Sequence, residues 1–125
     1  MVIALIVGAG GFIGAIARYG INSGFGRLLQ DQWLPYGTLT VNVVGCLLIG
    51  VVAGLIDYKQ IGGGELRAFV VIGILGGFTT YSAFGYETIN LIRDGNISAA
   101  IVNIATQIVL GLGAVWIGYK LATAA

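Results

Sequence analysis

Residues 76–84 read GGFTTYSAF, in the middle of an apolar stretch that runs from about Arg67 to Ile92. Paired glycines weaken an α-helix, and the β-branched Thr79 and Thr80 that follow weaken it further. As a continuous helix the stretch would be about 39 Å long, which is more than the ~30 Å hydrocarbon core of a bilayer requires. The sequence therefore predicts a membrane span that is interrupted near its midpoint, at Thr79–Thr80.

The composition around this stretch is that of an integral membrane protein. Of the 125 residues, 58% are hydrophobic and 9% are charged. A soluble domain of this size needs more charge to cover its surface. The 22 glycines suit transmembrane helices that approach one another closely. The net charge is +1 and there is no basic tract, so nothing suggests nucleic-acid binding.

Four segments have the roughly 20 mainly apolar residues that a transmembrane helix needs. They are residues 2–22, 37–56, 67–92 and 98–120. The connectors between them carry most of the remaining charge and the turn-forming residues, including Asp94-Gly95-Asn96. We therefore predict one all-α membrane domain, residues 1–125, with four transmembrane helices of which the third is broken.

The positive charges of the connectors favour neither orientation in the membrane. With the N-terminus in the cytoplasm, the basic residues on that side are Lys59, Arg67 and Lys120, and those toward the other side are Arg18, Arg27 and Arg93. The positive-inside rule then has almost no bias to act on. A balanced chain can insert both ways, which permits an antiparallel homodimer without proving one.

Residues 4–14, ALIVGAGGFIG, are similar to the strand and glycine turn of a dinucleotide-binding fold, with an acidic residue, Asp31, about 20 residues further on. The context does not support that interpretation. The segment before Asp31, SGFGRLLQ, is not a second strand, and another membrane-length span follows it. We favour the alternative, a face of small residues that includes Gly10-x-x-x-Gly14 and serves helix packing.

Three strongly polar residues lie within or near the spans: Arg18, Asn42 and Glu87. Because successive spans alternate in direction, all three belong to one half of the bilayer, where ionisable groups are costly and usually face a partner or water. Arg18 either extends to the interface or faces a path, and Glu87 either pairs with Arg18 or faces the same path. Asn42 either bonds a neighbouring helix or lines the path, because its amide needs partners in lipid.

Unwound backbone at the membrane midplane is tolerated only where protein buries it or where it faces an aqueous cavity. Broken helices at this depth commonly hold ions, and freed carbonyl groups suit a hard cation such as sodium, whereas freed N–H groups suit an anion. The alternative is an intact helix with a glycine notch for packing.

After the predicted break, Tyr81 and Phe84 share one helix face, and the edges of their rings are electropositive. Together with the Asn42 amide and the Ser82 hydroxyl they form a set of weak donors. Such a set can take a small anion from water and still release it. Simple packing of the aromatic pair is the alternative.

The combination of Arg18 in GAIARYG, Asn42 in GTLTVNVVG and the GGFTTYSAF stretch resembles the Fluc (CrcB) family of bacterial fluoride channels. The similarity covers all four spans. It implies a dual-topology antiparallel homodimer with two fluoride pores in the bacterial cytoplasmic (inner) membrane. It also implies one structural Na⁺ at the dimer centre, held by the backbone carbonyls of Gly76 and Thr79.

The same resemblance makes Asn42 the pore amide, Tyr81 and Phe84 the aromatic pair, and Ser82 part of a hydroxyl track. Glu87 matches a glutamate at the pore end, and Arg18 matches a vestibule arginine. The expected pore residues are Arg18, Thr40, Asn42, Tyr81, Ser82, Phe84 and Glu87. Two positions depart from the family pattern, since many relatives have phenylalanine in place of Tyr81 and a threonine is common in place of Ala83.

The function expected on this basis is passive export of fluoride that relieves its toxicity. A small four-helix drug/proton antiporter is the main alternative, and Glu87 is the candidate for the membrane carboxylate that it needs. A non-transporting membrane subunit is a second alternative, but it gives Asn42 and the break no role. An enzyme is least favoured, because the chain has no histidine and its single cysteine, Cys46, lies in an apolar run. Which of Asn103, Thr106 and Gln107 faces the path is left open.

Overall fold

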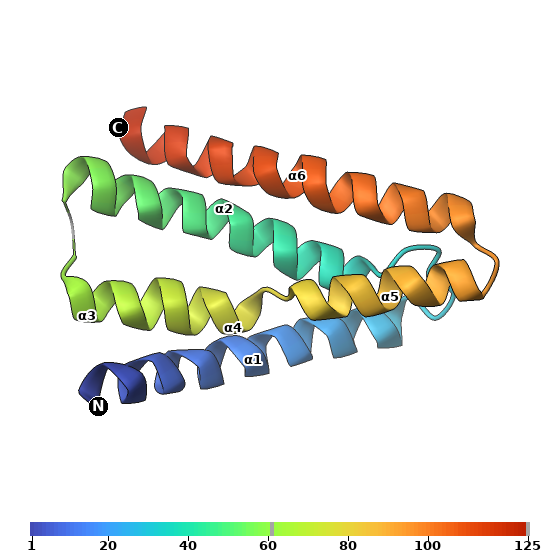
Figure 1. Ribbon diagram of the computed structural model, residues 1–125, viewed down its shortest axis with the longest axis horizontal. Coiled ribbons are helices and arrows are strands. Elements are labelled where there is room, and N and C mark those ends of the chain that lie inside the picture. Colours follow the sequence, from blue (N-terminus) through green and yellow to red (C-terminus); the bar gives the residue numbers. More distant parts are fainter. Residues whose placement is uncertain (61, 125) are drawn as a thin grey trace.

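The computed structural model describes residues 1–60 and 62–124, and the regular elements within them are all helices (Figure 1). Four segments of the described chain are long and apolar enough to cross a membrane: Val2–Leu28, Tyr36–Lys59, Gly64–Arg93 and Ile97–Ala124. The N-terminus and the end of the last helix lie at the same end of the bundle (Figure 1). The prediction of an all-α chain with four membrane-length helices is confirmed.

The first two spans and the last are single helices, and the third is built from pieces. The elements are α1 (Val2–Leu28), α2 (Tyr36–Lys59), α3 (Gly64–Arg67), η1 (Ala68–Leu75), α4 (Gly76–Phe78), α5 (Tyr81–Arg93) and α6 (Ile97–Ala124). The turn between α5 and α6 places Gly95 at φ 82°, a conformation that glycine adopts without strain. The turn predicted at Asp94-Gly95-Asn96 is therefore confirmed.

The third span is interrupted where the sequence predicted it. The helix α4 ends at Phe78, and the next two residues are extended, with φ −88° and ψ 158° at Thr79 and φ −151° and ψ 123° at Thr80. The helix then resumes at Tyr81. The preceding segment, η1, is π-helical, which was not predicted, because nothing in the apolar run AFVVIGIL distinguishes a π-helix from an α-helix.

The helices pack as two long pairs. In one pair α1 lies against η1 and α4, and in the other α2 lies along α6, while α5 packs against α6 (Figure 1). The first pair is in backbone contact, because a Cβ added at Gly10 would lie 2.9 Å from the Cα of Gly73, and one added at Gly77 would lie 2.8 Å from the carbonyl oxygen of Gly11. Gly10 and Gly14 therefore serve helix packing, as the small-residue interpretation predicted, and the dinucleotide interpretation was rightly set aside.

The helix α1 is longer than predicted. The sequence predicted an end at Asn22, but the helix continues to Leu28. Asn22 packs against Gly37 at the start of α2, where a Cβ on Gly37 would lie 3.1 Å from the Asn22 Cα, and this tertiary contact supports a segment whose local sequence is glycine-rich. Arg18 consequently lies well inside the span and not close to its end.

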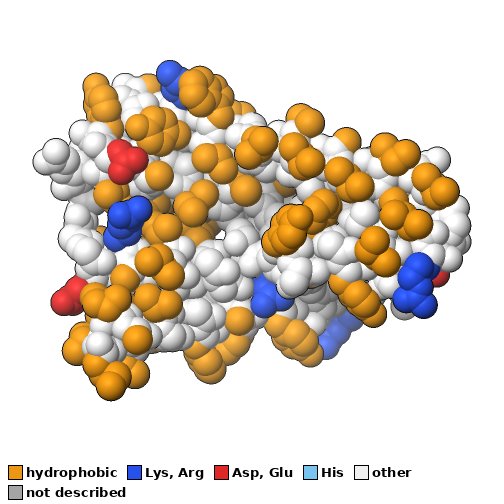
Figure 2. All heavy atoms as spheres, in the orientation of Figure 1, with side chains coloured by type: hydrophobic (Ala, Val, Ile, Leu, Met, Phe, Trp, Pro, Cys, Tyr) orange, Lys and Arg blue, Asp and Glu red, His pale blue; other side chains and the backbone are white. Residues whose placement is uncertain are grey.

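The outer surface of the bundle is apolar. Hydrophobic side chains are spread over the whole length of the face shown in Figure 2, and the charged side chains on it are few. Large aliphatic and aromatic residues on α1 and α6, such as Phe12, Ile16 and Leu112, are exposed. With four membrane-length helices, this surface is that of a multi-pass membrane protein.

Candidate functional site: a polar lane beside the broken helix

An open cavity of about 430 Å³ lies beside the break, between α2, the third span and α6. Five of the predicted site residues line it together: Gly76, Thr79, Asn42, Tyr81 and Phe84. Much of its wall is apolar, and its polar side chains include those of Asn42, Thr79, Thr80, Tyr81 and Gln107. The structure thus brings the amide, the aromatic pair and the broken backbone to one place.

The extended backbone of Thr80 is held by a side chain from α2. The Thr80 N–H donates to Asn42 Oδ1 at 2.8 Å, and Asn42 Nδ2 donates to the Thr80 carbonyl oxygen at 3.0 Å. The N–H and C=O of an extended residue point to the same side, so a carboxamide can pair with both as a neighbouring strand would. Asn42 therefore replaces the hydrogen bonds that the helix loses at the break.

A glutamine on α6 completes this arrangement. Asn42 Nδ2 also donates to Gln107 Oε1 at 3.0 Å, whereas Gln107 Nε2 is buried with no partner among the described residues. The sequence left the role of Gln107 open. A carboxamide in an otherwise apolar span indicated that Gln107 has a polar partner. That partner, Asn42, is 65 residues away in the sequence and could not be inferred from spacing.

Arg18 contacts the other side of the break. Its Nε donates to the carbonyl oxygen of Gly77 at 3.1 Å, at the C-terminal end of α4 where carbonyl groups lack helical partners. In the described part of the chain Arg18 makes this bond and no ion pair with Glu87, so the predicted pairing of the two is not found. Arg18 is half-buried beside the break.

Carbonyl groups at the break remain free within the described chain, and two of them belong to residues that line the cavity. Leu75 O accepts from both the N–H and the Oγ1 of Thr79, at 3.1 and 3.0 Å. The carbonyl oxygens of Gly76 and Thr79 have no hydrogen-bond partner among the described residues, and both residues line the cavity. These are the two carbonyl groups that the sequence resemblance singled out.

Thr80 also begins the helix after the break. Its Oγ1 accepts the N–H of Ala83 at 3.1 Å, as an N-cap side chain does, and lies 3.3 Å from the Ser82 hydroxyl. The sequence predicted Thr80 as a helix-weakening residue only, and this capping role was not predicted. The signal was present, because threonine before a helical segment is a common N-cap.

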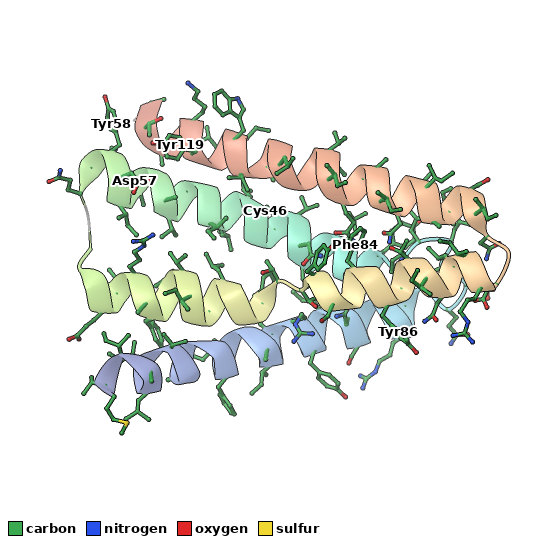
Figure 3. All side chains as sticks on the ribbon, in the orientation of Figure 1. Cys46, Asp57, Tyr58, Phe84, Tyr86 and Tyr119 are labelled. Carbon is green, nitrogen blue, oxygen red and sulfur yellow. The ribbon has the colours of Figure 1, made fainter. Side chains whose placement is uncertain are left out.

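The aromatic pair follows directly in α5. The rings of Tyr81 and Phe84 are 5.7 Å apart between centroids and tilted by 53°, which confirms that the two residues share one face. Phe84 is half-buried and points from α5 toward α2 and α6, whereas Tyr86 points to the opposite side (Figure 3). Tyr81 is 85% exposed, which is unusual for a residue beside polar backbone in a membrane span.

Behind Phe84, α5 is bonded to α6. The Thr88 hydroxyl donates to Phe84 O at 2.7 Å, and the fully buried Asn103 donates from Nδ2 to Thr88 Oγ1 at 2.9 Å. Asn103 was left open by the sequence. The structure places it in this helix contact, outside the residues that line the cavity.

The other predicted residues lie around the cavity and not in its wall. Arg18, Thr40, Ser82 and Glu87 do not line it. Glu87 instead lines a second cavity of about 190 Å³ together with Gln32, Trp33 and Asn90. One carboxylate oxygen of Glu87 and the hydroxyl of Thr38 are buried without partners among the described residues. The polar groups therefore continue from the break toward the end of the bundle that carries the α1–α2 connector.

A four-helix bundle with a discontinuous third span and polar groups beside the break is typical of a class of small multi-pass membrane proteins that handle ions. The family model described as "CrcB-like protein, Camphor Resistance (CrcB)" matches residues 5–119, and the chain belongs to this family. The resemblance inferred from the motifs is confirmed.

Curated relatives match over nearly the whole chain. A protein of Methylobacillus flagellatus is 40% identical over 117 residues, which cover 94% of this chain and 91% of the relative. A protein of Clostridium novyi is 42% identical over 121 residues, covering 97% and 94%. A protein of Paracoccus denitrificans is 44% identical over 114 residues, covering 91% and 89%. Each of the three is named "Fluoride-specific ion channel FluC".

Proposed function

We propose that this chain forms a fluoride-selective channel through which F⁻ leaves the cytoplasm passively across the bacterial inner membrane. The observation that carries the proposal is the cavity beside the break, where Asn42 holds the unwound backbone next to Tyr81 and Phe84. The names of the curated relatives support fluoride as the ion.

The chemistry of the cavity wall suits a small anion that must also be released. Ring edges, amide N–H groups and hydroxyl groups are weak donors, and no lysine or arginine is among the described residues that line the cavity. A full positive charge there would bind the anion and slow its exit. Passive export would relieve the toxicity of fluoride that enters as HF and dissociates inside the cell.

A second copy of the chain, antiparallel to the first, would complete the site. The cavity is open, and polar backbone at this depth is not tolerated against lipid, so a second protein surface that separates it from lipid would stabilise the site. The exposure of Tyr81 on the same face supports a protein partner there. The balanced positive charge of the two ends supports a copy of opposite orientation.

The residues at the break fit the structural Na⁺ that the resemblance implies. The free carbonyl oxygens of Gly76 and Thr79 are hard ligands of the kind that such cations prefer. A two-fold related copy would double the number of these oxygens around one ion. Bound there, Na⁺ would offset the partial negative charge of the carbonyl oxygens at both breaks.

The test is fluoride efflux from liposomes that contain the purified protein, followed with a fluoride electrode. We expect efflux driven by the fluoride gradient alone, with a membrane potential dissipated by a potassium ionophore, and little chloride efflux in parallel vesicles. Equal efflux of chloride would refute a fluoride-selective channel. Efflux that requires a proton gradient would refute a passive channel and would favour the antiporter.

A further inference from the structure

The orientation of two side-chain amides follows from a single backbone group. The Thr80 N–H can only donate, so the Asn42 atom 2.8 Å from it must be Oδ1. The remaining Asn42 atom is then Nδ2, which agrees with its contact to the Thr80 carbonyl oxygen at 3.0 Å, an atom that can only accept. The direction of the Asn42 amide is thereby fixed.

The same reasoning determines the orientation of the Gln107 side-chain amide. Asn42 Nδ2 is a donor, so the Gln107 atom 3.0 Å from it must be the acceptor, Oε1. Both N–H groups of Asn42 now have partners, one on Thr80 and one on Gln107. Asn42 therefore has no donor left for an ion, although it lines the cavity.

The free donors belong to Gln107 instead. Its Nε2 carries two N–H groups, is buried and has no partner among the described residues. A buried amide left in that state costs about 1–3 kcal/mol, so a partner that is not part of this chain is expected. Gln107 lines the same cavity as Tyr81 and Phe84. Nε2 itself is covered in this structure, so the Gln107 side chain must turn toward the cavity for its donors to reach a ligand beside the aromatic ring edges.

We propose that Gln107 is the carboxamide that donates hydrogen bonds to the permeating anion, and that Asn42 acts on the anion only by holding Thr80 and orienting Gln107. The ligand class is a small, strongly hydrated anion that accepts from N–H groups. This assignment rests on the proposed fluoride channel. It divides between two residues the roles that the resemblance gave to Asn42 alone.

Two substitutions of Gln107 distinguish its donation of hydrogen bonds to the anion from its hydrogen bond to Asn42. Gln107→Glu keeps an oxygen that accepts from Asn42 and removes the N–H donors, whereas Gln107→Met removes both. We expect fluoride efflux to fall by about 10-fold or more in each variant, with a lower ratio of fluoride to chloride efflux. The same two substitutions at Gln30, in the exposed connector between α1 and α2, are the matched control and should leave efflux unchanged.

The Asn42 variant should behave differently. A carboxylate at this position in Asn42→Asp still accepts from the Thr80 N–H but cannot donate to Thr80 O or to Gln107. We expect a lower thermal unfolding midpoint as well as reduced efflux, while Gln107→Glu reduces efflux with a smaller change in the midpoint. Fluoride efflux through the Asn42→Asp/Gln107→Met double variant should be no slower than efflux through the more impaired single variant, because the two residues act as one unit.

A measurement on the wild-type protein tests the same point without a variant. In ¹⁵N-labelled protein the side-chain NH₂ signals of Gln107 should shift as sodium fluoride replaces sodium chloride, and those of Asn42 should shift less. A shift at Asn42 with none at Gln107, or unchanged efflux in Gln107→Glu, would overturn the assignment while the channel itself stands. Absence of fluoride efflux from wild-type vesicles would refute the proposed function instead.

Discussion

Phe84 is held in place by bonds that start from its own backbone. Its carbonyl oxygen accepts from Thr88, and Thr88 accepts from the buried Asn103 of α6. These bonds link the backbone of α5 at Phe84 to α6, and the Phe84 ring meets Tyr81 at a tilted angle beside the cavity. At this position the ring edge, and not just its apolar bulk, is expected to matter for an anion.

Replacing Phe84 by Ile tests that expectation. Isoleucine keeps an apolar side chain but has no electropositive edge, so we expect fluoride efflux to fall by about 10-fold or more while size-exclusion elution stays unchanged. The control is Phe12→Ile, because Phe12 is 68% exposed on the outer face of α1. Efflux at the wild-type level in Phe84→Ile would remove the aromatic pair from the path.

Among the elements, the third span is the one that depends most on its neighbours. Glycines of α1 contact η1 and α4 through backbone, Arg18 bonds the end of α4, and Asn42 bonds the residue after it. A helix broken in the bilayer is unfavourable by itself, because each unpaired peptide group there costs several kcal/mol. Contacts from α1 and α2 offset that cost on both sides of the break.

The glycine contact between α1 and η1 can be tested with two alanines. A methyl group at Gly10 would meet the backbone of Gly73 and of Ile74 at 2.9 Å, whereas one at Gly8 would have no atom within 4 Å. We expect Gly10→Ala to destabilise the protein by about 1–3 kcal/mol and Gly8→Ala to be neutral or slightly stabilising. Thermal unfolding followed by circular dichroism in detergent compares them, and equal midpoints would contradict the close packing.

For the whole molecule, the orientation in the membrane depends on how the positive charges are distributed between the two ends of the bundle. Basic residues lie at both ends of the bundle, with Lys59 and Lys120 at one end and Arg27 and Arg93 at the other. The translocation machinery reads such residues near the ends of the spans, and here it finds little difference. The proposed antiparallel dimer requires both orientations from one sequence.

Labelling of intact cells would measure the orientation. In a Cys46→Ala background carrying Thr123→Cys near the end of α6, an impermeant thiol reagent should modify about half of the protein. Adding lysines at the same end through Asp57→Lys and Glu65→Lys should move that fraction toward zero, because this end is then retained in the cytoplasm. Complete labelling or none in the first variant would exclude dual topology.

Whether a structural feature could be predicted from the sequence depends on how far apart in the chain the interacting residues lie. The break at Thr79 and Thr80 was predictable, because glycine and β-branched residues act locally on a helix. The extension of α1 past Asn22 was not, since it depends on a contact with Gly37. The roles of the polar residues were the least predictable, because Arg18 and Gln107 take their functions from partners in other helices.

The two hydrogen bonds between Asn42 and the Thr80 peptide also restrict how the membrane span can move. Interrupted helices in secondary transporters are often flexible joints about which one half of the protein tilts. Here the N–H and C=O of Thr80 are both hydrogen-bonded to one side chain of α2, and these bonds restrain the break. In the proposed channel we therefore expect the ion to pass a wall that keeps one conformation, at a rate set by its hydration and by local attraction.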